Sequence, residues 1–298
     1  MIGRTRVGVA ATLLAGLALL SAPAADPPAG AGEPVVVVDS AGKEIRLAKV
    51  KVTAGTRRLG WLADPKGDAD ARKGPLALEV REPSSTTYAK GVVTLVPLAG
   101  VESVRYEVGK SLVGVKGRAE PVVGTTEYKG FNVIGLEGDA GGVSAKFSGG
   151  VTKAGIKSVT FPAARPLPER KADGPAWSVR IDQPKAGNPA LTVRNLKALY
   201  TFPGGVEQLA DALPVRKGEP LKLDGTLRRL EVLAVDANAH AAAAEVQAGD
   251  GPERTVVLPL TRDQDGRTGT LVGLLGEVDV GWKLFPLHTV KAVSPAGP

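Results

Sequence analysis

The segment Leu95-Val-Pro-Leu-Ala-Gly-Val-Glu-Ser-Val104 indicates how this chain folds. Pro97 has no backbone N–H and cannot lie inside a central strand, so the strand that precedes it ends there. Leu98 can fill the core at the corner, and Ala99-Gly100 turns the chain. From Val101 onward apolar residues alternate, which is typical of a strand with one buried face. The segment therefore predicts a strand, a Pro-Leu corner and a second strand.

Related segments recur along the chain. Leu284-Phe-Pro-Leu-His-Thr-Val-Lys-Ala-Val293 shares Leu, Pro, Leu, Val and Val with Leu95–Val104 at the same positions. Weaker copies begin at Val151 and at Leu191. Repeated units of this kind bury faces against one another, and their irregular spacing indicates related β-modules rather than a solenoid.

Glycine and proline divide the chain into short Val-rich runs. The 298 residues include 38 Gly and 23 Pro, spread evenly. Short β-branched runs between such residues are the pattern of antiparallel strands. We therefore expect a mainly β protein of sandwich- or barrel-like modules, carrying a degenerate strand, Pro-Leu corner and strand repeat, with at most one or two short helices. The apolar spacing of Val206–Leu213 predicts a short helix. The Ala-rich segment Asp236–Glu245 is open between helix and strand.

The N-terminus has the order of a secretory signal peptide. Arg4 and Arg6 precede an uncharged run, and small residues follow at Ala22 and Ala24. The run is shorter than the ~20 residues of a membrane-spanning helix, so we expect cleavage rather than anchoring. This interpretation places the mature protein in the periplasm or outside the cell, with no membrane span after cleavage.

Composition divides the rest of the chain. We expect a signal peptide at 1–25 and a Pro- and Gly-rich flexible lead-in at 26–34. A β domain at 35–162 follows. The segment 163–173 has several prolines and charges without apolar periodicity, and is interpreted as a linker. A second β domain is expected at 174–298, although one continuous sandwich stays open.

Several function classes are disfavoured by composition. The chain has no Cys, which excludes thiolate metal sites and Cys nucleophiles, and its domains must be held by ordinary cores. The formal charge is +7, but the basic residues are dispersed and aromatic residues make up only 4%. A nucleic-acid binder would gather both on one face, so we expect no nucleic-acid partner. Weak attraction to anionic envelope polymers remains open.

Candidate catalytic residues are few. His240 and His288 lie far apart in sequence, without metal-ligand neighbours, and are expected to be structural. Ser40-Ala-Gly-Lys43 matches Ser-x-x-Lys but is better interpreted as a hairpin turn. Asp263–Gly269 resembles the start of a calcium loop, yet the later ligands are missing and a turn is favoured. We expect no catalytic residue, metal or cofactor from these motifs.

The three tryptophans, Trp61, Trp177 and Trp282, are flanked by aliphatic residues or Gly, so burial is expected. Arg57-Arg58-Leu-Gly-Trp61 is the one place where basic and aromatic residues cluster. Arg57, Arg58 and Trp61 therefore form the candidate surface binding site, with a core role for Trp61 as the alternative.

Two hypotheses for function follow. The first is an exported, non-enzymatic envelope protein of tandem β-modules that binds a polymer or protein partner, or serves structurally. The alternative is an exported hydrolase with scattered active-site residues. That alternative would gain if His240 or His288 lies in a cleft beside a Ser or two carboxylates.

Overall fold

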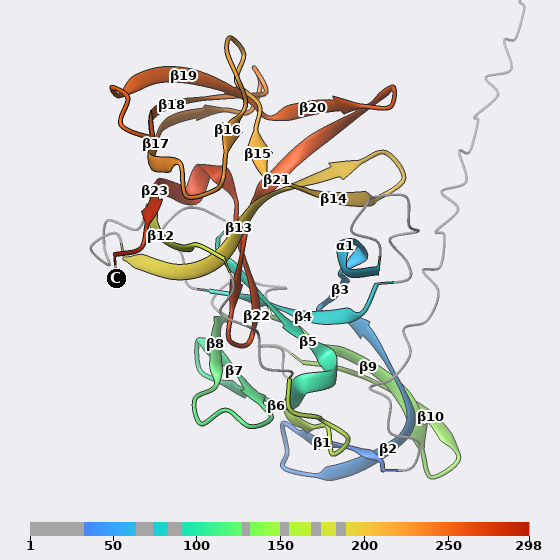
Figure 1. Ribbon diagram of the computed structural model, residues 1–298. Helices are drawn as coiled ribbons and strands as arrows, with labels where there is room; N and C mark the ends of the chain where they lie inside the picture. Colours follow the sequence, from blue (N-terminus) through green and yellow to red (C-terminus); the bar gives the residue numbers. More distant parts are fainter. Residues whose placement is uncertain are drawn as a thin grey trace, which may run out of the picture.

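The computed structural model describes residues 33–63, 74–82, 91–126, 132–149, 155–167, 174–182 and 189–297 (Figure 1). The expected signal peptide at 1–25 and nearly all of the lead-in at 26–34 lie outside these residues, as does the second part of the expected linker. None of the helices in the described part of the chain has the length and apolar composition that a membrane crossing requires.

The protein is mainly β, as the sequence predicts, and its strand ladders are antiparallel. Within the described residues it has one short helix, α1 (Gly60–Ala63), besides isolated 3-10 turns that include η2 (Leu98–Gly100) and η4 (Leu287–Thr289). Frequent Gly and Pro leave few stretches long enough for a stable helix.

The first sheet has eight strands. Their spatial order is β10 (Val143–Ser148), β9 (Gly135–Ala140), β2 (Glu44–Ala54), β1 (Val35–Asp39), β11 (Ile156–Thr160), β6 (Val101–Glu107), β7 (Lys110–Val115) and β8 (Val122–Thr125).

The second sheet contains the same arrangement of eight strands. Their spatial order is β22 (Gly281–Phe285), β21 (Arg267–Val278), β13 (Ala190–Phe202), β12 (Ala176–Ile181), β23 (Val290–Pro295), β17 (Leu227–Asp236), β18 (Ala241–Ala248) and β19 (Arg254–Pro259). Each sheet is built mainly from one half of the chain. In both, the strand that comes first in sequence lies in space between the second strand and the last one. On the other side of the last strand lies a meander of three strands. We call residues 33–167 the first half and 174–297 the second half.

The irregularities of the two sheets also correspond. In the first half the pairing of β2 with β9 shifts register between Ala48 and Lys51. In the second half the pairing of β13 with β21 shifts register between Arg194 and Lys197. Lys49 and Asn195, inside these two register shifts, both have a φ of 49°. Because bulges are specific features of a fold rather than random defects, these matches support two copies of one eight-strand unit.

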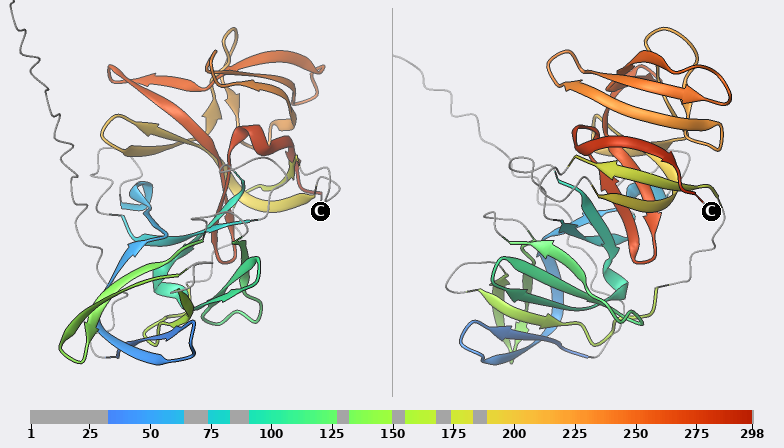
Figure 2. Two further views of the ribbon diagram at one scale, coloured as in Figure 1. Left: turned by 180° about the vertical axis from the view of Figure 1, so that it is seen from behind. Right: turned by 90° about the vertical axis from the view of Figure 1, so that its left-hand side faces the viewer.

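Three strands of the first half extend the second sheet. β5 (Val93–Pro97) pairs with β22, β4 (Leu76–Arg81) pairs with β5, and β3 (Thr56–Arg58) pairs with β4. The smaller strands of the second half are β14 (Val206–Ala210) on β13, β20 (Thr261–Gln264) on β21, and the pair β15 (Ala212–Leu213) and β16 (Leu221–Lys222). Figures 1 and 2 show the two groups of strands one above the other, joined where β5 lies along β22.

The predicted helix at Val206–Leu213 is wrong, because these residues form β14 and β15. Gly204 and Gly205 take positive φ and turn the chain back, so that Val206 pairs with Phe202 on β13. Ladder hydrogen bonds to a long strand outweigh the weak helix preference of eight residues. The open segment Asp236–Glu245 forms the β17–β18 hairpin.

The Pro-Leu corners form as expected at two places. Pro97 and Pro286 have φ of −52° and −53°, and each is followed by a 3-10 turn and a strand. However, the two corners do not occupy equivalent places in the two eight-strand units. The first corner follows β5, which is not one of the eight shared strands, whereas the second follows β22, which corresponds to β10. The copy proposed at Leu191 is wrong as a corner, because it lies inside β13. Residues 151–154 of the remaining copy lie outside the described residues.

Candidate functional site

A separate apolar cluster lies where the two halves meet. It is distinct from the larger core of each half, and its members include Leu59, Trp61 and Leu95 from the first half and Trp282 and Leu284 from the second. The cluster packs around the β5–β22 pair, in which Leu95 lies opposite Trp282 and Val93 opposite Leu284. The halves are therefore joined by both a continuous ladder and a shared core.

A cleft opens beside this cluster, between β3 and β4 on one side and β21, η4 and the β17–β18 turn on the other. Its volume is about 560 Å³. The polar residues that line it are Arg57, Glu79, Arg81, His240, Thr270 and His288. Its apolar floor includes Val93, Leu260, Leu271, Leu284 and Leu287. We call this the junction cleft.

Arg57 links the two halves at the edge of the junction cleft. Its guanidinium forms an ion pair with Glu207 of β14, and its Cζ lies 5.9 Å from the centre of the Trp61 ring. Burial raises the pKa of Glu207, Arg57 lowers it in part, and Glu79 raises it further. Oε2 of Glu207 is buried and has no hydrogen-bond partner among the described residues. The pair therefore places a half-buried cation and a poorly solvated carboxylate side by side.

The second arginine of the cleft is held from several directions. Arg81 lies 3.6 Å from Glu79 on the same strand. Its backbone N–H donates to Oδ1 of Asn132 at 2.7 Å, and its carbonyl accepts from Nδ2 of Asn132 at 2.9 Å. Asn132 thus fixes the end of β4, so the backbone that carries Arg81 has a defined position.

The three residues of the predicted surface site separate in the structure. Arg57 lines the cleft, whereas Arg58 donates from Nη1 to the carbonyl of Gly74 at 3.1 Å and is not among the lining residues. Trp61 is 3% exposed, so its ring face is not open for stacking, and burial is confirmed for all three tryptophans. Binding by Arg57 stays a prediction, in a cleft that the sequence did not indicate.

Both histidines line the junction cleft. His240 ends the β17–β18 turn with a φ of 46°, and its carbonyl accepts from the N–H of Leu260 at 2.8 Å. His288 belongs to η4, the corner beside β22. The hydrolase hypothesis called for a Ser or two carboxylates beside a histidine. The described lining has one carboxylate, Glu79, and Thr270 as its one hydroxyl.

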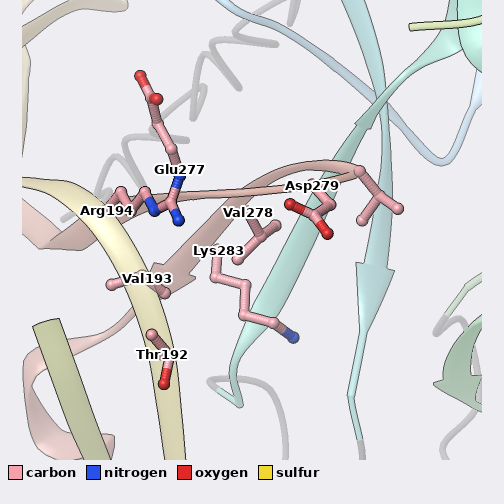
Figure 3. A pocket seen from close by; sticks show the side chains of 8 residues that line it. Thr192, Val193, Arg194, Glu277, Val278, Asp279 and Lys283 are labelled. Carbon is pink, nitrogen blue, oxygen red and sulfur yellow. The ribbon is translucent and has the colours of Figure 1, made fainter. Parts of the chain in front are cut away.

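A smaller cavity of about 350 Å³ lies against β13 and the β21–β22 turn (Figure 3). Figure 3 shows Arg194 of β13 beside Glu277 of β21, the residue it faces across the ladder. Nδ2 of Asn195 donates to Glu277 at 3.1 Å, and Lys283 forms an ion pair with Glu82 of the first half. Glu277 and Lys283 are thus engaged with residues outside the lining of this cavity, so it is a weaker candidate than the junction cleft.

The remaining motif candidates are turns. Oδ1 of Asp39 accepts from the N–H groups of Ala41 and Lys43, which fixes the β1–β2 hairpin around Ser40. Asp265 and Gly266 take positive φ between β20 and β21, as a tight hairpin requires. Over the described residues no cluster of three or more His, Asp or Glu side chains is placed to hold a metal ion.

Comparison of the chain with models of protein families, with curated proteins and with solved structures gave no match.

Proposed function

We propose that this protein is exported and acts outside the cytoplasm as a non-enzymatic β-modular binding protein, with its ligand in the junction cleft. Export is supported by the order of charged, apolar and small residues at the N-terminus. Binding is supported by the cleft itself, which is the observation that carries the proposal.

The junction cleft has the features of a small-molecule site. Such sites are concave, mostly apolar, about 300–1,000 Å³ in volume, and often lie between structural units. The cleft has a volume of about 560 Å³, an apolar floor and a few polar groups, and both halves contribute to it. A ligand held there would contact residues of both halves, so binding would also strengthen their junction.

Native mass spectrometry of protein isolated from the envelope fraction tests this proposal. We expect a bound small molecule on the wild type that is lost from Thr270→Trp, because Thr270 is exposed and lines the cleft. Thr268→Trp is the matched control, since Thr268 is exposed on the same strand but does not line the cleft. A wild type isolated without any small molecule, or equal retention by both variants, would contradict the proposal. The mass of the protein reports whether the leader has been removed.

An exported hydrolase is the second candidate, favoured by the presence of His240, His288 and Glu79 in one cleft. A histidine at such a site could act as general base. Hydrolysis of ester and glycoside substrates by the wild type, abolished in His240→Ala or His288→Ala with folding retained, would support it. Equal rates in wild type and variants would exclude a role for these histidines.

A further inference from the structure

We infer that the junction cleft binds an amphipathic organic anion, whose carboxylate or phosphate contacts Arg57 and whose aliphatic body lies on the apolar floor. This inference rests on the proposed function, since it names the chemistry of the ligand. It is argued from the hydrogen-bonding capacity of Arg57, the charges of the cleft wall and the composition of the floor.

Arg57 has donors to offer. A guanidinium carries five N–H groups arranged in a planar fork. Among the described residues Glu207 is its one ion-pair and hydrogen-bond partner, and that contact uses Nη2. The side chain of Arg57 is 20% exposed and lines the cleft. A planar fork of this kind binds carboxylate and phosphate oxygens through two parallel hydrogen bonds.

The other charges of the wall favour an anion as well. Arg81 is the second cation of the lining, the rings of His240 and His288 are able to donate hydrogen bonds, and Glu79 is the one acidic residue of the described lining. Glu207 is engaged with Arg57 at the edge of the cleft. The described lining therefore offers an entering carboxylate or phosphate two arginines and one carboxylate, while the carboxylate at the edge, Glu207, is already paired with Arg57.

The floor determines the rest of the ligand. Leu260, Leu271, Leu284 and Leu287 supply aliphatic surface from the bend between β19 and β20, from β21 and β22, and from η4. Burying an apolar chain there is favourable in proportion to the area removed from water. An inorganic anion would leave this surface wet, so the ligand needs a hydrocarbon body.

Glu207 acts as an internal competitor in this arrangement. Its carboxylate occupies part of the Arg57 fork while the cleft is empty, and burial raises its pKa, which indicates a poorly solvated charge. Removing the charge of Glu207 frees the guanidinium for the ligand. Substitutions of the two partners should therefore move ligand affinity in opposite directions, whereas a purely structural role of the pair would lower affinity in both.

The experiment measures binding of decanoate, decyl phosphate and decan-1-ol to the purified protein by calorimetry, each below its micellar concentration. We expect both anions to bind at least tenfold more tightly than the alcohol, because a charge-assisted hydrogen bond contributes about this factor. The tighter of the two anions identifies the head group. Arg57→Gln should weaken anion binding about tenfold, Glu207→Gln should strengthen it, and Arg58→Gln, which lies outside the cleft lining, should leave it unchanged.

If Arg57→Gln does not fold, Arg57→Lys replaces it in the experiment, because lysine keeps the positive charge but lacks the planar fork of donors. Equal affinity for the alcohol and the anions, or equal effects of substitutions at Arg57 and Arg58, would overturn the inference. If all three probes bind equally and Thr270→Trp abolishes their binding, the anion is wrong while the proposed binding function stands. If none of the probes binds the wild type, the inference fails, and native mass spectrometry decides the proposed function separately.

Discussion

Trp61 of the first half and Trp282 of the second half meet edge to face, with ring centroids 6.5 Å apart and ring planes at 88°. Both rings are buried, at 3% and 8% exposure. An edge-to-face pair contributes about 0.5–1.5 kcal/mol beyond the burial of its area. This contact fastens α1 to β22, so a helix of four residues takes part in joining the two halves.

Trp61→Ala should lower the free energy of unfolding by about 3–5 kcal/mol, because it removes a buried ring and leaves a cavity at the junction. Urea denaturation followed by intrinsic fluorescence measures this change. Leu62→Ala is the control, since Leu62 is 42% exposed and should change stability by less than about 0.5 kcal/mol. An unchanged urea midpoint for Trp61→Ala would contradict the core role of this ring and support a role at the surface.

Gly281→Ala should separate the two halves. A Cβ at position 281 would lie 2.0 Å from the carbonyl oxygen of Leu95, on the strand that β22 pairs with. The strand must move to relieve this overlap, at a cost of about 1–3 kcal/mol. We expect calorimetry to show one transition for the wild type and two for the variant. Gly225→Ala is the control because its new Cβ meets nothing within 4 Å, and a single unshifted transition in both variants would refute the prediction.

Tyr106 fastens the start of β9 to β6. Its hydroxyl donates to the carbonyl of Asn132 at 2.8 Å and accepts from the N–H of Ile134 at 3.0 Å. Tyr106→Phe leaves both backbone groups without this partner, so we expect a loss of about 1–3 kcal/mol at neutral pH.

The same residue predicts a response to alkali. Burial raises the pKa of Tyr106 from 10.0 to about 12. The stabilisation that the neutral phenol provides is therefore complete below pH 10 and declines as pH rises through 12. The difference in unfolding free energy between wild type and Tyr106→Phe should shrink over this range, as urea titrations at stepped pH would measure. A constant difference would contradict the assignment.

Glu207 predicts an effect in the acidic range. Because burial raises its pKa above the ordinary value of 4.5, its protonated form favours the folded chain relative to the unfolded one. This contribution is fully present below that ordinary value and is lost as pH rises through the folded pKa. The unfolding free energy of wild type minus that of Glu207→Gln should therefore fall as the pH rises from the ordinary value of 4.5 through the higher pKa of the folded chain. A difference that stays flat over this range would contradict the prediction, because it would show that Arg57 compensates the burial of Glu207.

The strands could be predicted from sequence because the signals for them are local. Runs bounded by Gly and Pro, such as Val35–Asp39, became strands, and the Asp and Gly residues at chain reversals became hairpins. The strand Val206–Ala210 was missed because its conformation is decided by a ladder with β13 rather than by its own spacing. The duplication left a clear trace in Gly135-Leu-Glu-Gly and Gly273-Leu-Leu-Gly, each followed at the same distance by Phe147 or Phe285.

The site could be predicted only in part. Arg57 was singled out, but its partner Glu207 lies 150 positions away, in a segment expected to be helical. The burial of Trp61 depends on Trp282 from the other half, and no local pattern in the sequence brings the two together. His240 and His288 share a cleft because a hairpin turn and a Pro-Leu corner meet in space, which their separation in sequence conceals.

The two copies of the eight-strand unit differ at one outer strand, and this difference matches which of the two sheets is extended. β22 presents Trp282 and Leu284 where it receives β5, whereas the corresponding β10 carries Ser144 and Lys146 at the end of its sheet. If β10 carried the same two apolar residues, it would offer an apolar, unpaired edge on which strands of other molecules could add. A charged residue on a terminal strand is a known safeguard against such growth. Trp282 and Leu284 thus belong to the strand that joins the two halves, whereas Ser144 and Lys146 belong to the strand that ends a sheet.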